Sequence, residues 1–346
     1  MSTEVAAPQR VEPAVKESRG NWLQVLRTCS LPPGRRVDPV SKWLIVTRAC
    51  VQPMTLTSIA VAGLLAVHHA AFAPLLFALA ALGSIVAHAA NNMINDYFDL
   101  EEGLDTDTYP RTLYAPHPVT SGLISRAGLQ RAILAANALD ALILTVLFVA
   151  RGWPVVAFAA TGLFISVFYV APPLRLKARG MGEPAVFVIW GPVMVGGTYF
   201  AATGEMPLGV LAASVPYALL VTSVLMGKHI DKAPWDAPQG VATLPVVMGE
   251  TAARRATVAL MAAFYVVTAL LVVVGALPVW TAVVALALPR FGAVKATYGR
   301  PKPDHPPEGY RLWPLWFVSA AFVHARRAGA ALVTGLFLGA LWPVFI

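Results

Sequence analysis

The sequence predicts an all-α polytopic membrane bundle of nine transmembrane helices with a polar cap on the cytoplasmic side. The chain is 57% hydrophobic and only 13% charged, with a mean hydropathy of +0.65. A soluble domain carries about 25% charged residues. Apolar runs approach the length of about 20 residues that a helix needs to cross a bilayer. Polar loops separate these runs, which argues against one oversized soluble core.

Nine apolar runs are candidate spans. They cover approximately 43–67, 71–94, 127–149, 153–173, 184–203, 207–227, 252–275, 277–296 and 328–345. One further segment, 311–325, is short and Trp-rich. It is either an interfacial helix or an early start of the ninth span.

The distribution of Lys and Arg predicts the orientation. With nine spans, every Lys and Arg except Arg151 falls on the N-terminal side of the membrane. The positive-inside rule makes this side cytoplasmic and puts the C-terminus on the opposite side, in a bacterial-type plasma membrane. The net charge of +8 therefore does not indicate a nucleic-acid partner. The long polar loops 95–126, 228–251 and 297–311 share the cytoplasmic face, where we expect the functional site.

The N-terminal segment differs in composition from the rest of the chain. Residues 1–40 are polar and Pro-rich and lack the apolar region of a signal peptide. They predict a disordered cytoplasmic arm, followed by one nine-helix domain over 41–346. Cys29 and Cys50 have no metal-binding spacing, and a disulfide between them is not indicated.

Amides and acids follow the second apolar run in the stretch NNMINDYFDLEEGLD, 91–105. On a helix, residues three or four apart share one face; this face carries His88, Asn92, Asn95, Asp96 and Asp99. Such a face is costly against lipid, so it should point into the bundle or a wet cavity. Capping does not explain acids at a helix C-terminus, because they oppose the helix dipole.

Two carboxylates one turn apart form a hard-oxygen site that suits Mg²⁺, which also bridges to phosphate oxygens. Asp105 and Asp107 follow Gly103, where a turn would bring them back toward this site.

A second acidic segment, 227–250, follows the sixth span on the same side of the membrane. It contains Lys228, His229, Asp231, Lys232 and Asp236. Two facing acidic clusters predict two metal sites that clamp a diphosphate and neutralise charge on the leaving group. The alternative is a loop of solvated charges.

Between the two acidic segments lies FYVAPPLRLKARGMGE, 168–183. Its Arg175, Lys177 and Arg179 either hold phosphate oxygens or anchor the chain at the membrane edge.

These motifs resemble the UbiA superfamily of intramembrane prenyltransferases. NDYFD supplies Asn95, Asp96 and Asp99 of the family's first Asp-rich motif. Gly103 at the third acid position, with Asp105 two residues later, is similar to the menaquinone-type branch that prenylates dihydroxynaphthoate. The loop 168–183 is similar to YxxPPLxLKxRGxGE, and HPVTSGLIS resembles RPLxSGxIS. The resemblance covers 43–345 and implies nine helices, Mg²⁺ on two Asp-rich motifs, an isoprenyl diphosphate, a lipophilic acceptor and a membrane lipid environment.

The second motif departs from the family pattern DxxDxxxDxxxGxxTLPVxxG. Asp236 is kept, but Lys232 and His229 stand at the two preceding acid positions, and Asp231 lies one residue out of register. Pro234 predicts an irregular backbone through which Asp231 would still reach the site. Alternatively, the ammonium of Lys232 replaces the charge of one metal. His117 is another departure, at a position where the family tends to have Arg.

The resemblance implies Mg²⁺-assisted ionisation of a prenyl diphosphate and transfer of the prenyl group to an aromatic or other lipophilic acceptor. The aromatic face of Tyr169 is a candidate to stabilise the carbocation. The predicted roles are catalysis for Asp96, Asp99, Asp236 and Tyr169, diphosphate binding for Asn92, Asn95, Arg175, Lys177, Lys228 and Lys232, and metal coordination for Asp96, Asp99, Asp231 and Asp236.

Several alternatives stay open. The acceptor is aromatic or else a carotenoid, a glycerophosphate lipid or a sugar phosphate. An ion-coupled transporter is disfavoured, because the polar clusters lie at one face and not at the midplane. An inactive binding protein stays open because of Lys232. Asn137 and Asp140 in the third span either line an acceptor pocket or bond to a neighbouring helix, and we favour the second because such contacts are common in bundles.

Overall fold

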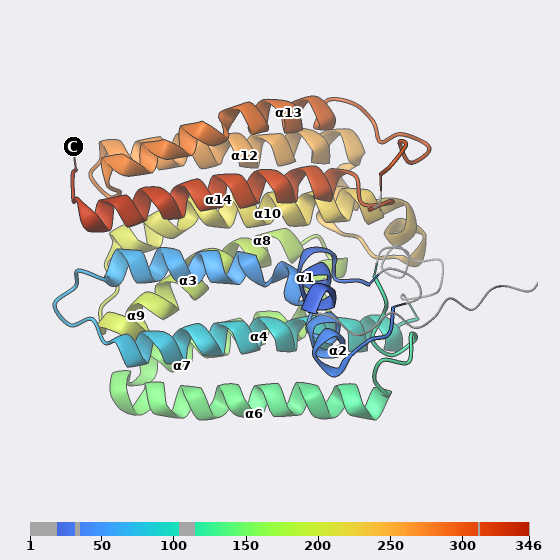
Figure 1. Cartoon of the computed structure of the whole chain (residues 1–346), viewed down its shortest axis with the longest axis horizontal. Coiled ribbons are helices and arrows are strands. Elements are labelled where there is room, and N and C mark those ends of the chain that lie inside the picture. Colours follow the sequence, from blue (N-terminus) through green and yellow to red (C-terminus); the bar gives the residue numbers. More distant parts are fainter. Residues whose placement is uncertain (1–18, 32–34, 104–114, 311, 346) are drawn as a thin grey trace, which may run out of the picture.

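The chain folds into a bundle of long helices that lie side by side (Figure 1). The computed structural model describes residues 19–31, 35–103, 115–310 and 312–345. In this part of the chain, seven helical segments are long and apolar enough to cross a membrane: Ala49–Ala66, Pro74–Glu101, Arg126–Arg151, Gly182–Thr203, Leu208–Gln239, Glu250–Val273 and Val279–Tyr298. The predicted all-α polytopic membrane bundle is therefore confirmed.

The first half of the bundle contains α3 (Gln52–Ala66), α4 (Pro74–Glu101), α6 (Arg126–Arg151) and α7 (Trp153–Phe168). A proline occupies one of the first two helical positions of α3, α4 and α7, where its missing N–H costs no hydrogen bond. At 1.5 Å per residue α4 is roughly 42 Å long. That exceeds the hydrocarbon core of about 30 Å, so the acidic end of α4 extends beyond it.

A kinked helix follows, made of α8 (Gly182–Val188), the π-helical turn η3 (Ile189–Gly196) and α9 (Gly197–Thr203). Gly191 has φ −97° and ψ −107°, and the next residue, Pro192, has no N–H to donate. Ser58 Oγ donates to the carbonyl of Trp190 at 2.8 Å, which satisfies a backbone acceptor at the kink. The kink lies where Trp190 lines a cavity inside the bundle.

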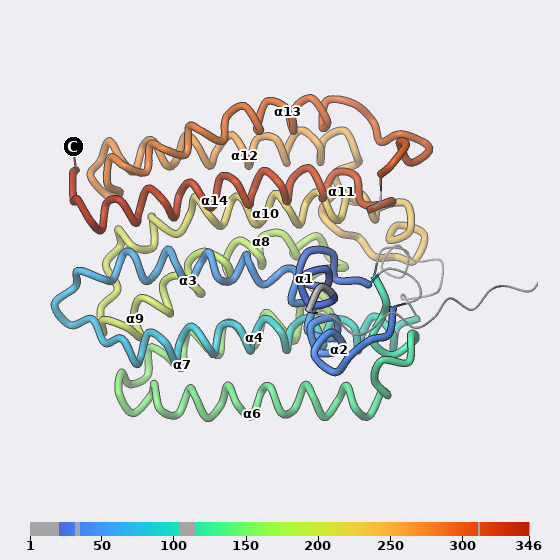
Figure 2. Tube along the Cα trace, viewed as in Figure 1, coloured from blue at the N-terminus to red at the C-terminus, as the bar shows by residue number. Residues whose placement is uncertain are grey.

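The second half contains α10 (Leu208–Asp236), α12 (Glu250–Val273), the 3₁₀ segment η5 (Val279–Ala287) with α13 (Leu288–Tyr298), and α14 (Phe317–Leu341). These helices lie together on one side of the bundle, whereas α4, α6 and α7 lie on the other (Figure 2). The helix α10 contacts α8, α12 and α14 and carries much of the main core. It therefore connects the two halves.

Two predicted boundaries differ from the structure, and one open alternative is decided by it. The predicted first span, 43–67, is broken: α2 (Pro39–Val46) is followed by the 3₁₀ turn η1 (Ala49–Val51) before α3 begins. The predicted loop after the sixth span is helical as far as Asp236. Pro234 does not end that helix, because packing on several sides outweighs a proline cost of about 3 kcal/mol. Of the two alternatives for 311–325, the early helix is correct from Phe317.

The segment before α3 is folded where it is described. Helix α1 (Arg19–Thr28) packs on α2, and Trp22 Nε1 donates to Asp38 Oδ1 at 2.9 Å. Cys29 and Cys50 form a disulfide with a Cα–Cα distance of 5.3 Å. The expectation of a disordered arm is wrong for these residues, and so is the expectation that the cysteines are unpaired. Residues 1–18 and 32–34 lie outside the described part.

Asp231 joins α10 to the start of α14. Its two carboxylate oxygens accept the backbone N–H groups of Phe317 at 3.0 Å and Val318 at 2.9 Å. Lys302 Nζ lies 3.7 Å from the same carboxylate. Burial lowers the pKa of Lys302, and the charge of Asp231 opposes that shift. Asp231 thus satisfies N–H groups that a helix N-terminus leaves unpaired.

Asp231→Ala should destabilise the protein. The substitution removes the acceptor of two N–H groups of α14, and the buried one, that of Phe317, costs about 1–3 kcal/mol when left unpaired. We expect a lower melting temperature of the detergent-solubilised protein, followed by intrinsic fluorescence. An unchanged melting temperature together with a lost Mg²⁺ response would contradict this assignment and return Asp231 to the metal site.

Candidate active site

The polar face of α4 points into the protein, as its spacing predicts. Its buried residues include His88, Asn92, Asp96 and Asp99, and Asp96 has no exposed surface. Asn95 is half-buried, and its Oδ1 atom has no hydrogen-bond partner among the described residues. The helix therefore carries two carboxylates and, within the described part of the chain, one amide oxygen without a hydrogen bond, all in about one turn.

Asp96 is held from two directions. Arg48 forms an ion pair with it, and Arg48 Nε donates to Oδ2 at 3.3 Å. His117 Nδ1 accepts the N–H groups of Val119 and Thr120. The proton of this imidazole is therefore on Nε2, which donates to the backbone oxygen of Asp96 at 3.2 Å. His117 is thus a positioning residue for the first acidic motif.

Arg48 belongs to the candidate site, although the sequence counts it only as one of many membrane-edge charges. It lies between α2 and η1 with φ 52°, in the left-handed region that non-glycine residues seldom adopt. It lines the central cavity described below. Arg48 does not belong to a recognisable sequence motif. Its left-handed backbone and its contact with Asp96, 48 residues later in the sequence, are therefore seen only in the structure.

Asp99 pairs with Lys177 on the short turn η2 (Leu176–Ala178), at 2.5 Å between Nζ and Oδ1. The N–H of Lys177 donates to the carbonyl of Tyr169 at 2.9 Å. Ala242 donates its N–H to the carbonyl of Ala178 at 3.2 Å, which ties this loop to the segment after α10. The loop with the basic motif therefore lies between the two acidic segments.

The end of α10 supplies the opposite side of the cluster. Lys228, Lys232 and Asp236 are spaced four residues apart and share a helix face. The ammonium of Lys232 interacts electrostatically with Asp99, and Tyr169 interacts with both Asp99 and Asp236. The two acidic segments thus come together, as predicted, but the second one lies on a helix and is mixed with lysines.

Two predicted diphosphate ligands have other partners. Arg175 pairs with Glu102 at 2.8 Å and is half-exposed, so its guanidinium already has a carboxylate partner. Asn92 donates to the backbone oxygen of Thr47 at 3.1 Å and thereby holds the corner after α2.

The predicted metal role of Asp231 is also corrected, because its oxygens cap α14. Asp105 and Asp107 lie outside the described residues.

His229 and Glu183 form a buried pair at 2.7 Å between Nδ1 and Oε1. His229 Nε2 and Glu183 Oε2 have no hydrogen-bond partner within the described part of the chain. His229 occupies one of the acid positions of the second motif. Its pairing with Glu183 joins α10 to α8 next to Tyr169.

The two acidic segments differ in their fitness for a divalent cation. No group of three or more His, Cys, Asp and Glu side chains that could hold a metal occurs among the described residues. Asp96, Asp99 and the oxygen of Asn95, which accepts no hydrogen bond from the described residues, nevertheless fit Mg²⁺, which uses one or two carboxylates and completes its shell with water and phosphate oxygens. Asp236 lies beside Lys232, whose positive charge disfavours a second cation there.

A cavity of about 810 Å³ begins at this charged cluster. The cluster comprises Arg48, Asp96, Asp99, Tyr169, Lys177, Lys228, Lys232 and Asp236. Arg48, Tyr169 and Lys228 belong both to the cavity wall and to the cluster. Farther along, the wall is apolar, with residues of α4, α6, α7 and α9. The cavity therefore has one end lined by the basic residues Arg48 and Lys228 and a long apolar end.

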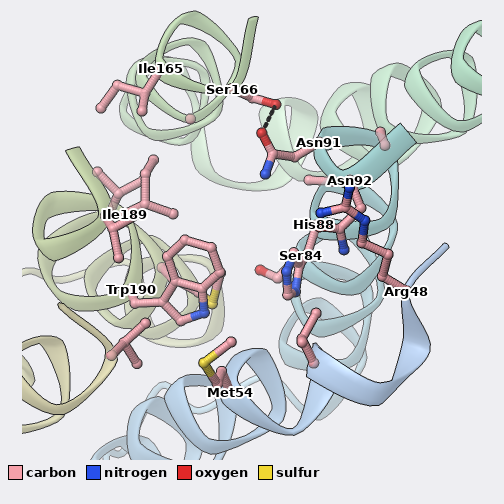
Figure 3. Close-up of a pocket in the computed structure, with 18 of the residues that line it drawn as sticks. Arg48, Met54, Ser84, His88, Asn91, Asn92, Ile165, Ser166, Ile189 and Trp190 are labelled. Atoms are coloured by element: carbon pink, nitrogen blue, oxygen red, sulfur yellow. Dashed lines mark hydrogen bonds between the residues drawn. The ribbon is translucent and has the colours of Figure 1, made fainter. Parts of the chain in front are cut away.

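The middle of the cavity has an aromatic wall. Figure 3 shows Trp190 and Ile189 on one side of this region and His88 and Ser84 on the other, with Met54 beside them. The rings of His88 and Trp190 meet edge to face at 5.1 Å between centroids. This wall offers a π-face to a ligand between the charged end and the apolar end.

Asn137 and Asp140 on α6 line the same cavity. The amide of Asn137 donates to Ile133 of its own helix at 2.8 Å. Asp140 Oδ1 is buried and makes no hydrogen bond within the described residues. The preference for bonds to a neighbouring helix is therefore wrong for both residues.

Comparisons with known proteins agree with this site. A model of the UbiA prenyltransferase family matches residues 56–313. The chain is 28% identical over 221 residues to 1,4-dihydroxy-2-naphthoate octaprenyltransferase of Bacillus subtilis (strain 168), which covers 62% of this chain and 68% of that protein. It is 27% identical over 262 residues to digeranylgeranylglyceryl phosphate synthase of Haloquadratum walsbyi, covering 74% and 84%.

A solved structure has the same fold. It is a UbiA homolog from Archaeoglobus fulgidus bound to GPP and Mg²⁺, with a TM-score of 0.57 at 17% identity, covering 84% of this chain and 99% of that one. Since the family model spans most of the sequence, the predicted family and activity are confirmed. The chain belongs to the UbiA prenyltransferase family and is a membrane-embedded enzyme that transfers a prenyl group from a diphosphate to an acceptor.

Proposed function

We propose that the enzyme binds its prenyl diphosphate with the diphosphate between the ends of α4 and α10 and the isoprenoid tail in the cavity. The observation that carries this proposal is that Arg48 and Lys228, from distant segments, line one largely apolar cavity, and that Arg48 also pairs with Asp96 of the charged cluster. An amphipathic substrate with an anionic head and a hydrocarbon tail fits such a site.

Mg²⁺ is the proposed cofactor, held by Asp96 and Asp99 with the oxygen of Asn95. A UbiA homolog bound to GPP and Mg²⁺ supports this assignment. When bound, the ion neutralises charge that develops on the diphosphate leaving group. Arg48 and Lys177 fix the orientation of the two carboxylates and donate to phosphate oxygens.

On the α10 side, the positive charge comes from side chains. We assign Lys228 and Lys232 to the phosphate oxygens, with Asp236 orienting the lysines or contacting the ion's water shell. Lys228 interacts electrostatically with Lys232, Arg48 and Lys177, so these basic side chains lie together where the diphosphate would lie. The lysines replace the carboxylate-bound metal that the family's second motif implies.

The aromatic residues of the cavity stabilise the allylic carbocation. Tyr169 lies at the cluster and Trp190 farther along the wall, and their π-faces stabilise positive charge on the allylic fragment. The apolar lining excludes water, which would otherwise trap the cation.

For the acceptor, we propose an aromatic ring of the dihydroxynaphthoate class. The relative named 1,4-dihydroxy-2-naphthoate octaprenyltransferase and the NDYFD motif with Gly103 support this choice. The relative named digeranylgeranylglyceryl phosphate synthase makes a glycerophosphate lipid the second candidate.

We further propose nine crossings of a bacterial-type plasma membrane. Seven segments qualify by length and apolarity, and α7 and α14 run alongside them (Figure 1). The distribution of basic residues supports an N-terminus and active site on the cytoplasmic side and a C-terminus opposite. The catalytic unit is then 41–346, with the preceding residues as an N-terminal attachment.

Asp96→Ala and Asp236→Ala should each reduce Mg²⁺-dependent release of pyrophosphate by about 10²-fold or more, because each removes charge that positions the leaving group. The assay uses membranes with prenyl diphosphates and both acceptor classes. Glu205→Ala is the control, since Glu205 is exposed and pairs with His69 away from the site. Full activity of both variants, or no release by the wild type with any substrate pair, would refute the proposed site.

The wild type should bind Mg²⁺ with single-site saturation in the presence of a non-hydrolysable prenyl diphosphate analogue. Lys232→Asp places a second carboxylate one turn from Asp236 and should add a second, separately titrating ion. Lys232→Met removes the charge without adding a ligand and should add none. Calorimetry gives the stoichiometry, and two ions bound to the wild type would contradict the lysine assignment.

A further inference from the structure

Asp140 is an ionisable group deep inside the bundle that the proposed chemistry does not use. It lies in the middle of α6, lines the central cavity and has a buried Oδ1 atom without a hydrogen-bond partner among the described residues. A Cβ built on Gly83 of α4 would lie 3.7 Å from that oxygen. Intramembrane carboxyl groups are costly, so this position calls for a function.

Asp140 lies well away from the charged cluster. Gly83 and Asn95 are on the same helix, and their separation in the sequence corresponds to roughly 18 Å along its axis. An isoprene unit contributes four chain bonds, about 5 Å when extended, by the same geometry that gives a peptide residue about 3.5 Å. Four units therefore reach from the cluster to the level of Asp140.

The wall changes character at this depth. Between the cluster and Asp140, the tail meets the rings and apolar side chains around Trp190 and passes the amide of Asn137. Beyond Asp140, the cavity continues for about one helical turn along α4, to Ala80, and for about two turns along α6, to Leu147. A fifth isoprene unit would lie against the carboxyl group of Asp140 and displace any water bound to it. Removing water from a polar group that gains no new hydrogen bond is unfavourable.

We propose that Asp140 is a specificity-determining residue that sets the preferred tail at about four isoprene units. This inference rests on the proposed function, because it takes the charged cluster as the anchor of the diphosphate. The fourth unit ends beside the carboxyl group, whereas longer tails pay for its desolvation. Asp140 limits the length of the donor and takes no part in ionisation or transfer.

The test measures binding, which requires no acceptor. Prenyl S-thiolodiphosphates of two, three, four, six and eight units are titrated with Mg²⁺ against the full chain in nanodiscs, and inorganic diphosphate reports on the head-group site alone. The variants are Asp140→Leu and Asp140→Asn. All three side chains have nearly the same size, so the pair separates polarity from volume. Asn137→Leu, one turn away on the same wall, controls for an added apolar group.

Affinity of the wild type should rise from two to four units and fall at six. Asp140→Leu should raise the affinity ratio of six units over four by roughly tenfold, the effect of matching apolar groups in a pocket. Asp140→Asn and Asn137→Leu should keep the wild-type ratio. The dependence of wild-type affinity on tail length tests the proposal by itself, so the proposal can be decided even if a variant fails to fold.

A wild-type affinity that rises steadily to eight units would overturn the role of Asp140, as would equal shifts in the Leu and Asn variants. In either case, the diphosphate site itself would stand. If no prenyl analogue binds better than inorganic diphosphate, the proposed function fails as well, since the cavity then holds no tail.

Discussion

Mutual neutralisation of buried charges is the constraint on which the site depends. Asp96 and Asp99 sit at the end of an apolar helix with little or no exposed surface, where an unpaired carboxylate would be very unfavourable. Arg48 and Lys177 pair with them. Removing one member of such a pair leaves a buried charge, so the arrangement tolerates little displacement. The positions of the cations must therefore be as well defined as those of the acids.

Several contacts between distant segments provide that definition. The disulfide ties α1 to the turn that follows Arg48, and the amide of Asn92 holds the carbonyl of Thr47 just before it. The backbone bond between Ala178 and Ala242 fixes the loop of Lys177 against the segment after α10. Cations and carboxylates are thus held by separate parts of the chain, and the site forms only when the bundle is assembled.

Local periodicity explains what the sequence predicts well. The inward face of α4 follows from a repeat of three and four residues and from the cost of charge in lipid, and neither depends on tertiary detail. The same reasoning fails after the sixth span, because Pro234 suggests a break that packing overrides. It also misassigns Asp231, whose acceptor role depends on the distant start of α14. Local periodicity does not predict the role of Arg48, because its pairing with Asp96 depends on the tertiary fold.

The lysines at the end of α10 change how the site balances its charge. A site made of two carboxylates carries negative charge until it binds a metal ion. The amino groups of Lys228 and Lys232 belong to the protein itself, so they are present whether or not a metal is bound. Together with Arg48 and Lys177, they face Asp96, Asp99 and Asp236, so the cluster is close to neutral before any ligand enters.

A diphosphate then enters a site whose cations need only exchange a carboxylate partner for a phosphate oxygen. Such an exchange involves little reorganisation of the protein, which is the feature that makes preorganised charge effective in catalysis. In the proposed site, it also places the divalent ion on the α4 side of the cluster, where the two carboxylates and the amide oxygen of Asn95 lie close together on one helix.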